Sequence, residues 1–303
     1  MKNDIIHVAC GLNDHYLMPY GVMLVSLFET NKTNKFHIHV FSGEFSDRSI
    51  ETLRNITQKY NAGFSFYPLD PSLFNNLAVS ERISSVTYYR DLIPEAINPE
   101  VEKIAYLDGD MIVLGDIRPL WEIDLEGYTI AAADDIAAIK FKEYDRLNIP
   151  EKFGYFNSGT ILINRKEWIK NDISRKIFSY TRENIEILKY LDQDAENFTL
   201  CDKRKTLEQK WNQQVGIYFL RQKFLDSFFS QEQVKEIKKK PVIVHFNGME
   251  KPWEYVNLHP YKKEFQYFLK ISGFKKPEGK FIFRKLVKKI VYRILGWSWW
   301  NRI

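Results

Sequence analysis

The N-terminal third of the chain alternates between short apolar runs and longer stretches with apolar residues at helical spacing. Strands are predicted at the apolar runs that end in polar or turn-forming residues, namely 5–10, 36–41, 64–67 and 103–107. Helices are predicted where the helical spacing holds, namely 17–29, 46–60 and 86–96. Strands that alternate with helices are typical of βαβ units, so we expect an α/β fold with a mainly parallel sheet flanked by helices.

The pattern in the rest of the chain is less regular but still predicts both kinds of element. Strands are expected at 128–133, 160–163 and 241–244, and helices at 172–183 and 192–200. No internal repeat and no low-complexity linker interrupts the sequence before its C-terminal tail. We therefore expect one domain over residues 1–274, with its ligand bound beyond the carboxyl ends of the parallel strands.

Residues 275–303 differ from the preceding chain in charge and in pattern. They contain nine Lys/Arg and one acidic residue, a net +8, so residues 1–274 carry −3 of the chain's total of +5. Apolar residues recur there in pairs every four positions from Ile282 to Leu295, and three tryptophans follow. A basic amphipathic helix of this kind is suited to lie on an anionic membrane surface; a helix packed on the body with solvated lysines is the alternative. Nucleic-acid binding is disfavoured because the body is acidic and no recognition motif accompanies the basic residues.

Composition indicates a globular chain of the cytosol. With 303 residues, 45% of them hydrophobic, the chain can bury one large α/β core or two modest ones. Its two cysteines, Cys10 and Cys201, form neither a disulfide framework nor a ligand spacing, which fits a reducing compartment. The start lacks the apolar stretch of a signal peptide, and no apolar run approaches the roughly 18 residues of a spanning helix. We expect a cytoplasmic protein, soluble or peripheral on the inner face of the cytoplasmic membrane.

Asp108 and Asp110 stand where the strand predicted at 103–107 ends. In an extended chain, residues two apart point to the same side, so both carboxylates can close on one cation. Gly109 between them has no side chain to obstruct a phosphate brought in by that cation. A dicarboxylate at a strand end suggests an enzyme that handles a metal-bound phosphate ester or nucleotide, although Asp-Gly-Asp is also ordinary turn chemistry.

His245 follows the late strand predicted at 241–244, much as the two aspartates follow theirs. Carboxylate ligands suit Mg²⁺ and Mn²⁺, and an added imidazole favours Mn²⁺. Gly248 permits close backbone approach, and Lys251 supplies a cation of the kind that a diphosphate leaving group requires. The alternatives are a structural histidine and a surface lysine.

Other polar residues have both a functional and a structural interpretation. Gln193 can project a neutral amide into the crevice, whereas Asp192 before it can simply cap the helix that follows. Asn157 and Ser158 can hydrogen-bond sugar hydroxyls or form a turn. Arg90 can pair with a carboxylate or reach a bound ligand.

Four motifs occur in order along the chain: Asp-Gly-Asp at 108–110, Tyr-Phe-Asn-Ser-Gly at 155–159, Asp-Gln-Asp at 192–194 and His-Phe-Asn-Gly-x-x-Lys-Pro-Trp at 245–253. In this order they resemble the family 8 retaining glycosyltransferases, over nearly the whole chain. The Asn-Asp-His-Tyr loop at 13–16 and the basic tail look most like the bacterial lipopolysaccharide core glucosyl- and galactosyltransferases. The resemblance implies a GT-A fold, in which a nucleotide-binding Rossmann-like half merges with an acceptor-binding half. It also implies a UDP-glucose or UDP-galactose donor, Mn²⁺ or Mg²⁺ as cofactor, and an α-linkage formed with retention.

The resemblance further implies roles for individual residues. The metal ligands would be Asp108, Asp110 and His245. Contacts to the nucleotide and diphosphate would come from Ala9, Gly11, Asn13, His15, Tyr16, Thr87, Gly109, Gly248 and Lys251. The donor sugar would be surrounded by Arg90, Asp135, Asn157 and Ser158, with Asp192 and Gln193 at the reacting carbon. The chain departs from the family pattern at Asn13, where relatives often have an acidic residue, and at His15, where they often have an asparagine. Asp134 is the alternative to Asp135.

Retention of configuration poses a chemical problem, because a double displacement needs a nucleophile on the sugar face opposite the leaving group. The residue expected there is Gln193, and an amide is a poor nucleophile. We therefore expect a same-face substitution, in which Gln193 or Asp192 steadies positive charge at the anomeric carbon. The acceptor expected from the resemblance is a glycan or glycolipid, the lipopolysaccharide core above all.

Rival functions are less well supported by the sequence. In metal-dependent phosphohydrolases, Asp-x-Asp normally follows the first strand and continues into Gly-Thr, whereas here Met111 follows the motif. A nicotinamide-dependent enzyme is disfavoured because no Gly-x-Gly-x-x-Gly opens the first helix. A catalytically silent glycan-binding or membrane adaptor protein stays open as an alternative.

Overall fold

The computed structural model describes residues 5–70, 72, 85–248, 251–254, 257 and 259–276. The basic amphipathic helix predicted within 275–303 therefore lies outside the described residues, apart from the first two positions. Within the described ranges, no helix combines the length and the hydropathy needed to cross a membrane.

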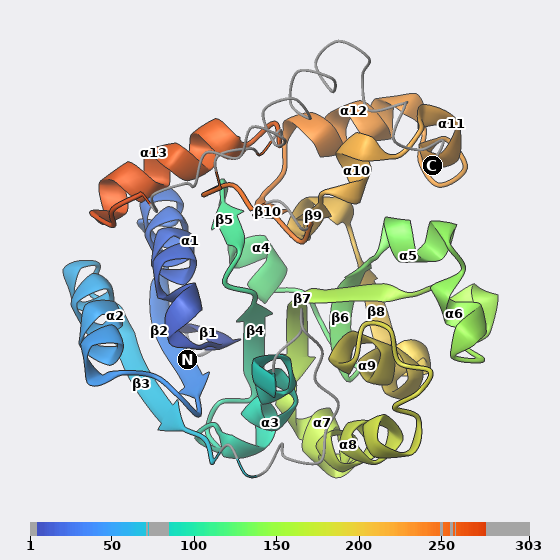
Figure 1. The fold of residues 1–303 in the computed structure, drawn as a ribbon, viewed down its shortest axis with the longest axis horizontal. Coiled ribbons are helices and arrows are strands. Elements are labelled where there is room, and N and C mark those ends of the chain that lie inside the picture. The colour runs from blue at the N-terminus through green and yellow to red at the C-terminus, as the bar shows by residue number, and fades with distance from the viewer. Residues whose placement is uncertain are drawn as a thin grey trace.

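A seven-stranded sheet runs through the centre of the molecule in the order β3-β2-β1-β4-β7-β6-β8 (Figure 1). Its strands are β1 (Ile5–Gly11), β2 (Lys35–Ser42), β3 (Gly63–Pro68), β4 (Lys103–Leu107), β6 (Ile130–Asp134), β7 (Phe156–Asn164) and β8 (Arg204–Leu207). Strand β7 runs antiparallel to both of its neighbours, β4 and β6, and the other strands are parallel to one another. The expected α/β fold with a mainly parallel sheet is thus confirmed, with one antiparallel strand near its middle.

A second, smaller sheet lies beside the carboxyl end of β4. It consists of β5 (Met111–Val113), β10 (Ile243–His245) and β9 (Gln213–Gln214). β10 pairs antiparallel with β5 and parallel with β9, and the register places His245 opposite Met111. This pairing brings the end of a late strand to the residue that follows Asp110.

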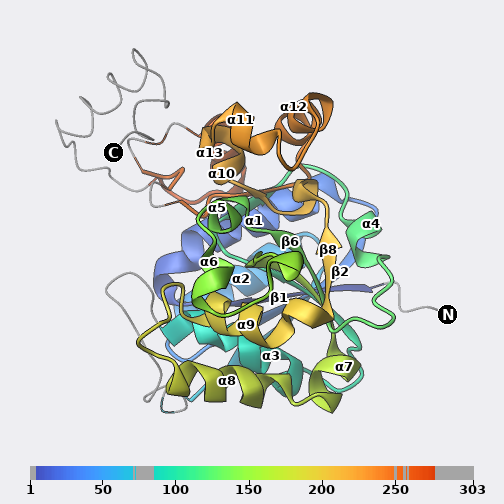
Figure 2. The same cartoon turned by 90° about the vertical axis from the view of Figure 1, so that its right-hand side faces the viewer.

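Helices cover both faces of the main sheet (Figures 1 and 2). The α-helices are α1 (Leu17–Thr30), α2 (Asp47–Lys59), α3 (Tyr89–Ala96), α4 (Arg118–Trp121), α5 (Ile136–Lys140), α6 (Glu143–Arg146), α7 (Arg165–Lys170), α8 (Ile173–Glu183), α9 (Asp192–Leu200), α10 (Gly216–Phe219), α11 (Gln222–Leu225), α12 (Gln231–Lys239) and α13 (Lys262–Ser272). On one face, α1 packs against Ile6 and Val8 of β1. On the other, residues of α3, α7, α8 and α9 pack against β4, β6 and β7. Because both faces are covered, the inner strands read as nearly continuous apolar runs.

The observed elements differ from the expected ones at several boundaries. Residues 85–88 form a 3₁₀ turn, so the helix expected over 86–96 begins only at Tyr89. β7 begins at Phe156 rather than at residue 160, which places Asn157 and Ser158 inside the strand instead of in a turn. His245 is the last residue of β10, not a residue that follows the strand. Polar side chains in these strands interrupt the apolar pattern because they face the site described next.

Candidate active site

Asp108 and Asp110 lie in the short connection that links the two sheets, between the end of β4 and the start of β5. The backbone N–H of Asp108 donates to the carbonyl of Gly159 at 2.9 Å, and Phe246 N–H donates to the carbonyl of Asp110 at 3.0 Å. A Cβ at Gly109 would come within 3.0 Å of the Tyr16 ring, so the close packing here favours glycine. The loop is therefore held from both sides, by β7 and by the chain after β10.

His245 completes a cluster with the two aspartates. Its Nε2 lies 3.5 Å from Asp108 Oδ2 and 3.3 Å from Asp110 Oδ1. One potential ligand atom from each residue falls within 4.8 Å of the others, an arrangement that could hold a metal ion. Oxygen ligands with one imidazole nitrogen suit Mn²⁺, and Mg²⁺ accepts the carboxylates.

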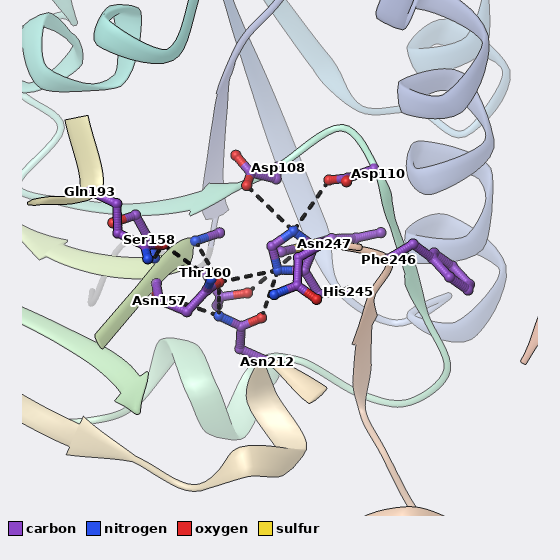
Figure 3. A network of polar contacts seen from close by, with 12 residues as sticks. Asp108, Asp110, Asn157, Ser158, Thr160, Gln193, Asn212, His245, Phe246 and Asn247 are labelled. Atoms are coloured by element: carbon purple, nitrogen blue, oxygen red, sulfur yellow. Dashed lines mark hydrogen bonds and ion pairs between the residues drawn. The ribbon is translucent and has the colours of Figure 1, made fainter. Parts of the chain in front are cut away.

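The second nitrogen of His245 is fixed by two amides (Figure 3). His245 Nδ1 lies 3.1 Å from Asn157 Oδ1 and 3.0 Å from Asn212 Oδ1. The orientation of the Asn157 amide follows from its other bonds, because its Oδ1 accepts from Gly159 N–H at 3.1 Å and its Nδ2 donates to Asp135 Oδ2 at 3.2 Å. Both amide oxygens are acceptors, so Nδ1 carries the hydrogen, and in the neutral ring the lone pair of Nε2 faces the two carboxylates. Such an arrangement is repulsive unless a cation or a proton lies between them, and it therefore fits a metal ligand.

Lys251 approaches the same cluster from the chain beyond β10. Its Nζ lies 2.6 Å from Asp110 Oδ2 and donates to the carbonyl of Phe246 at 2.9 Å. Burial alone would raise the pKa of Asp110, but the charge of Lys251 above all, together with His245 when its ring is protonated, outweighs that effect and holds the pKa below its ordinary value. Asp110 is consequently ionised, as a metal ligand must be.

Arg90 of α3 is buried beneath the cavity and joins three parts of the chain. Its guanidinium donates to the carbonyl of Ser158 at 2.5 Å, and Nη2 lies 3.4 Å from Asp108 Oδ1. Nε lies 3.3 Å from Asp192 Oδ2. The Tyr106 ring packs under the guanidinium at 4.6 Å, and its hydroxyl donates to Asp108 Oδ1 at 2.8 Å. Arg90 thus positions one metal-site carboxylate and the start of α9 together.

Gln193, Asp135 and Asn157 form a connected group on the side of the cavity away from Lys251. Gln193 Oε1 accepts from Asn157 Nδ2 and from the N–H of Ser158, both at 3.1 Å, and its Nε2 lies 3.4 Å from Asp135 Oδ2. Asp135 caps α5, because its other oxygen accepts from Ala138 N–H at 3.0 Å. Burial raises the pKa of Asp135, and the bonds from Ala138, Asn157 and Gln193 oppose that rise.

A second group of carboxylates lies behind Arg90. Asp91 and Glu196 are both fully buried, and Ser158 Oγ donates to Glu196 Oε2. Burial raises the pKa of Glu196 to about 7, and burial followed by the charge of Glu196 raises the pKa of Asp91 well above its ordinary value. Burial also raises the pKa of Asp192 against the opposing charge of Arg90. Burial thus makes the carboxyl groups behind Arg90 bind protons more tightly than ordinary aspartates and glutamates do.

These groups open into one cavity of about 610 Å³ and a smaller neighbour of about 200 Å³. Of the residues that the sequence singles out, those that line the larger cavity are Thr87, Arg90, Asp108, Asp110, Asp135, Asn157, Asp192, Gln193, His245, Gly248 and Lys251. Those that line the smaller one are Gly11, Asn13, Tyr16 and Gly109, with Thr87, Arg90, Asp108 and Asp110 shared between the two. The Oδ1 atom of Asn13 is buried and has no hydrogen-bond partner within the described part of the chain. An orphaned acceptor in a cavity wall is suited to receive a donor from a ligand.

Three of the predicted contacts are not brought to either cavity. Ala9 is fully buried within β1, and His15 is exposed beside the smaller cavity without lining it. Ser158 is 1% exposed, lines neither cavity, and its hydroxyl donates to Glu196. Its backbone holds Gln193 and Arg90 in place. Of the two adjacent aspartates, Asp134 pairs with Arg204 at 2.7 Å, whereas Asp135 lines the larger cavity.

Sequence reasoning missed several residues of the site. Asn212, which orients His245, precedes the two-residue strand β9, and nothing in the local pattern marks it. The sequence identifies Tyr106 only as a residue of a predicted strand and Glu196 only as a residue of a predicted helix. Glu196 carries no distinguishing signal either, because its neighbours on the helix include the polar residues Asp192, Gln193 and Asn197. The cavity wall formed by α5 and α10 was not anticipated either.

Comparison with known proteins places this arrangement among characterised enzymes. The chain is 31% identical over 272 residues to general stress protein A of Bacillus subtilis (strain 168), covering 88% of this chain and 94% of that protein. It is 28% identical to a lipopolysaccharide 1,2-glucosyltransferase of Escherichia coli, over 83% of this chain and 74% of that enzyme. Among solved structures, the galactosyltransferase LgtC in complex with donor and acceptor sugar analogues matches with a TM-score of 0.79 at 21% identity, covering 90% of this chain and 98% of that one.

The chain shares the GT-A fold of LgtC, and a carboxylate–imidazole cluster lies at the end of its sheet. Residues 7–257 match glycosyl transferase family 8, and the chain belongs to that family. It is accordingly a retaining glycosyltransferase that takes its sugar from a nucleotide-sugar donor and passes it to a glycan acceptor.

Proposed function

We propose that the protein transfers glucose or galactose from a UDP-sugar, with Mn²⁺ as the metal and Mg²⁺ as the alternative, to a glycan or glycolipid acceptor. Asp108, Asp110 and His245 are the proposed metal ligands. The observation that carries the proposal is the Nε2 lone pair of His245, fixed by Asn157 and Asn212 so that it faces two carboxylates.

The surroundings of the cluster suit a diphosphate. When bound, the metal would neutralise charge on the diphosphate as the sugar–phosphate bond breaks. Lys251 is placed to contact the same diphosphate, because its ammonium already lies against Asp110. Asn13 and Tyr16 line the neighbouring small cavity, where the uridine would lie with the orphaned Asn13 oxygen as an acceptor. In this scheme Gly11, Thr87, Gly109 and Gly248 contribute backbone or side-chain contacts along the nucleotide.

The group around Gln193 is the proposed site of the donor sugar. Arg90, Asp135 and Asn157 surround it, and Asp192 lies beside it at the start of α9. Gln193 Oε1 already accepts two hydrogen bonds, which leaves the amide oriented but weakly nucleophilic. We therefore favour a same-face substitution, in which the phosphate oxygen of UDP takes the acceptor's proton and Gln193 or Asp192 steadies the charge at the anomeric carbon. A glycosyl adduct on either residue, found by mass spectrometry during a single turnover, would overturn this mechanism.

UDP release tests the proposed function directly. UDP-glucose and UDP-galactose would each be incubated with the protein and Mn²⁺, with and without excess EDTA, and UDP measured enzymatically. We expect release from one of the two donors, loss of release in EDTA, and a fall of at least about 100-fold in Asp108→Asn, in keeping with the loss of a charged ligand. Asp202→Asn, which removes an exposed aspartate paired with Lys203, is the matched control and should retain release. No metal-dependent release from either donor would instead favour a silent glycan-binding protein.

The proposed acceptor and location follow from the named relatives and from the composition of the C-terminal tail. Two kinds of relative with lipopolysaccharide acceptors in their names, a 1,2-glucosyltransferase and a 1,3-galactosyltransferase, support a lipopolysaccharide core or a similar glycolipid. The composition of residues 275–303 supports peripheral attachment of a catalytic domain, residues 1–274, to the cytoplasmic face of a membrane. Sedimentation with anionic vesicles, compared between the full chain and a chain that ends at residue 274, tests that attachment.

A further inference from the structure

The larger cavity has a second end, beyond Asp135, whose lining differs from that of the metal end. Helix α5 starts at the Asp135 cap and finishes at Lys140, so it carries the cavity wall roughly 7 Å outward from the sugar site. Helix α10 forms the facing wall, where a Cβ at Gly216 would touch Ala137 Cβ at 3.5 Å. In Figure 1, α5 lies to the right of the small sheet above the start of β7, and α10 lies above it, next to β9.

Lys140 stands at this end, and no carboxylate of the described residues pairs with it. The other two cations that line the cavity are both paired, Arg90 with Asp192 and Lys251 with Asp110. Within the described part of the chain, no ion pair or hydrogen bond holds the Lys140 ammonium, which lies 5.0 Å from the centre of the Phe141 ring and 5.9 Å from that of Phe224. A partly buried cation that faces a cavity and lacks a counter-charge is suited to an anionic ligand.

Aromatic side chains stand beside this cation. Phe141 is 65% exposed, and Phe219 and Tyr190 line the same stretch of cavity. Exposed aromatic rings at the mouth of a polar cavity are typical of a ligand-binding groove. The apolar C–H face of a pyranose ring can pack on such a ring, while its substituents reach the polar groups around it.

The two ends of the cavity carry opposite charge. Four aspartates line the metal and sugar sites, namely Asp108, Asp110, Asp135 and Asp192, against two cations, Arg90 and Lys251. An acidic substituent on the acceptor would be repelled there and attracted to Lys140, so the charge would also orient the acceptor with its other end toward the donor sugar.

We propose that the acceptor is an anionic saccharide, whose ring packs against Phe141 and Phe219 and whose carboxylate or phosphate pairs with Lys140. This inference rests on the proposed function, because the cavity takes an acceptor only if its other end holds an activated sugar. It adds the chemical class of the acceptor, which the motifs shared with other transferases leave open.

Three glycosides that differ at one carbon test the proposal: methyl glucoside, methyl glucuronide and methyl glucoside 6-phosphate. Their dissociation constants would be measured by calorimetry on the full chain saturated with Mn²⁺ and UDP. We expect one or both anionic glycosides to bind about threefold to tenfold more tightly than the neutral one, the range of a partly exposed charge pair. The glucuronide and phosphate arms distinguish which acid the site prefers. In Lys140→Gln the ratio of anionic to neutral affinity should fall to about one, and Lys140→Arg should restore it.

Lys142→Gln is the matched control, because Lys142 is exposed, lies two residues further on and lines neither cavity; it should keep the wild-type ratio. Equal affinity for all three glycosides, or no binding of any of them, would overturn the inference. Slower acceptor-independent UDP release in Lys140→Gln would also overturn it, since the lysine would then serve the donor. Failure of the proposed function is seen separately, as an absence of Mn²⁺-dependent UDP release in the wild-type protein.

Discussion

A methyl group added at Gly159 tests whether close packing positions the metal ligand His245. Gly159 lies in β7 directly beneath the imidazole. A Cβ there would fall 2.5 Å from His245 Nδ1 and 2.8 Å from the Met111 methyl carbon, and closer still to the ring carbon Cε1. Neither Asp108 nor Asp110 nor the ring itself changes chemically in Gly159→Ala, so any loss of metal binding would come from displacement alone.

The size of the effect follows from these distances. To reach ordinary van der Waals separation, the Nδ1 contact must open by roughly 1 Å, whereas metal–ligand distances tolerate only about 0.2 Å. The ring cannot simply turn, because Nδ1 is held by Asn157 at 3.1 Å and Asn212 at 3.0 Å. Disturbing the support of a ligating histidine typically costs about 10- to 100-fold in metal affinity, on the order of 2 kcal/mol. We expect a loss in that range.

Calorimetric titration of Mn²⁺ into the UDP-saturated protein measures the affinity, and thermal unfolding without metal reports whether the variant still folds. Gly115→Ala is the control, since a Cβ at that glycine would meet Val242 at an ordinary 3.4 Å. A Gly159→Ala variant that folds and binds Mn²⁺ within threefold of wild type would refute this reasoning. It would show that neither packing against β7 nor the hydrogen bonds of Asn157 and Asn212 fix the position of the His245 ring.

Three further predictions concern charge, pH and the core. Lys251→Met removes the cation that lies 2.6 Å from Asp110, and kcat/KM for the UDP-sugar should fall about 10- to 100-fold, as for a lost charge-assisted hydrogen bond, while Lys251→Arg should lose less. Burial raises the pKa of Glu196 from 4.5 to about 7, so its contribution to stability is fully present below pH 4.5 and is lost as the pH rises through 7. The free energy of unfolding in urea should therefore fall by on the order of 3 kcal/mol between pH 4.5 and 8, and this pH dependence should be weaker in Glu196→Gln. An equal pH dependence in the variant would exclude Glu196 as its source. Trp168→Phe removes the indole N–H that donates to Ser174 Oγ at 2.9 Å in the buried layer under α3. The free energy of unfolding in urea should fall by about 1–3 kcal/mol, and the KM for the donor should stay unchanged.

The sequence predicts best the part of the fold whose long strands are covered by helices on both faces of the sheet. β1 and β2 are buried on both faces, so their apolar runs are continuous and their boundaries fall within a residue or two of the expected ones. The strand predicted at 160–163 starts later than β7 does, because the polar residues Asn157 and Ser158 also fit a turn. Asn157 is polar because it faces the site, and Ser158 because it bonds the buried Glu196, which is why local pattern and tertiary structure disagree there.

Of the small sheet, only β10 was predicted from the apolar pattern, as the strand at 241–244. Strands of two or three residues, such as β9 and β5, are too short to show an alternating pattern. The motifs nevertheless identified its functional residue, His245, because a histidine after an apolar run is visible without knowledge of the pairing. Asn212 has no such mark, since its role exists only once β9 lies beside β10.

The metal cluster and the sugar group meet at one amide. Asn157 Oδ1 supports His245, and its Nδ2 contacts both Asp135 Oδ2 and Gln193 Oε1 (Figure 3). A displacement of the imidazole by a few tenths of an ångström must therefore be transmitted to Gln193, because the amide is rigid and planar and its bonds on both sides are already formed. The position of the antiparallel strand β7 makes this possible. Because β7 lies between β4 and β6, one of its residues can contact the chain segments that follow both strands. The proposed metal ligands and the amide of the proposed sugar site are consequently parts of a single network rather than two adjacent sites.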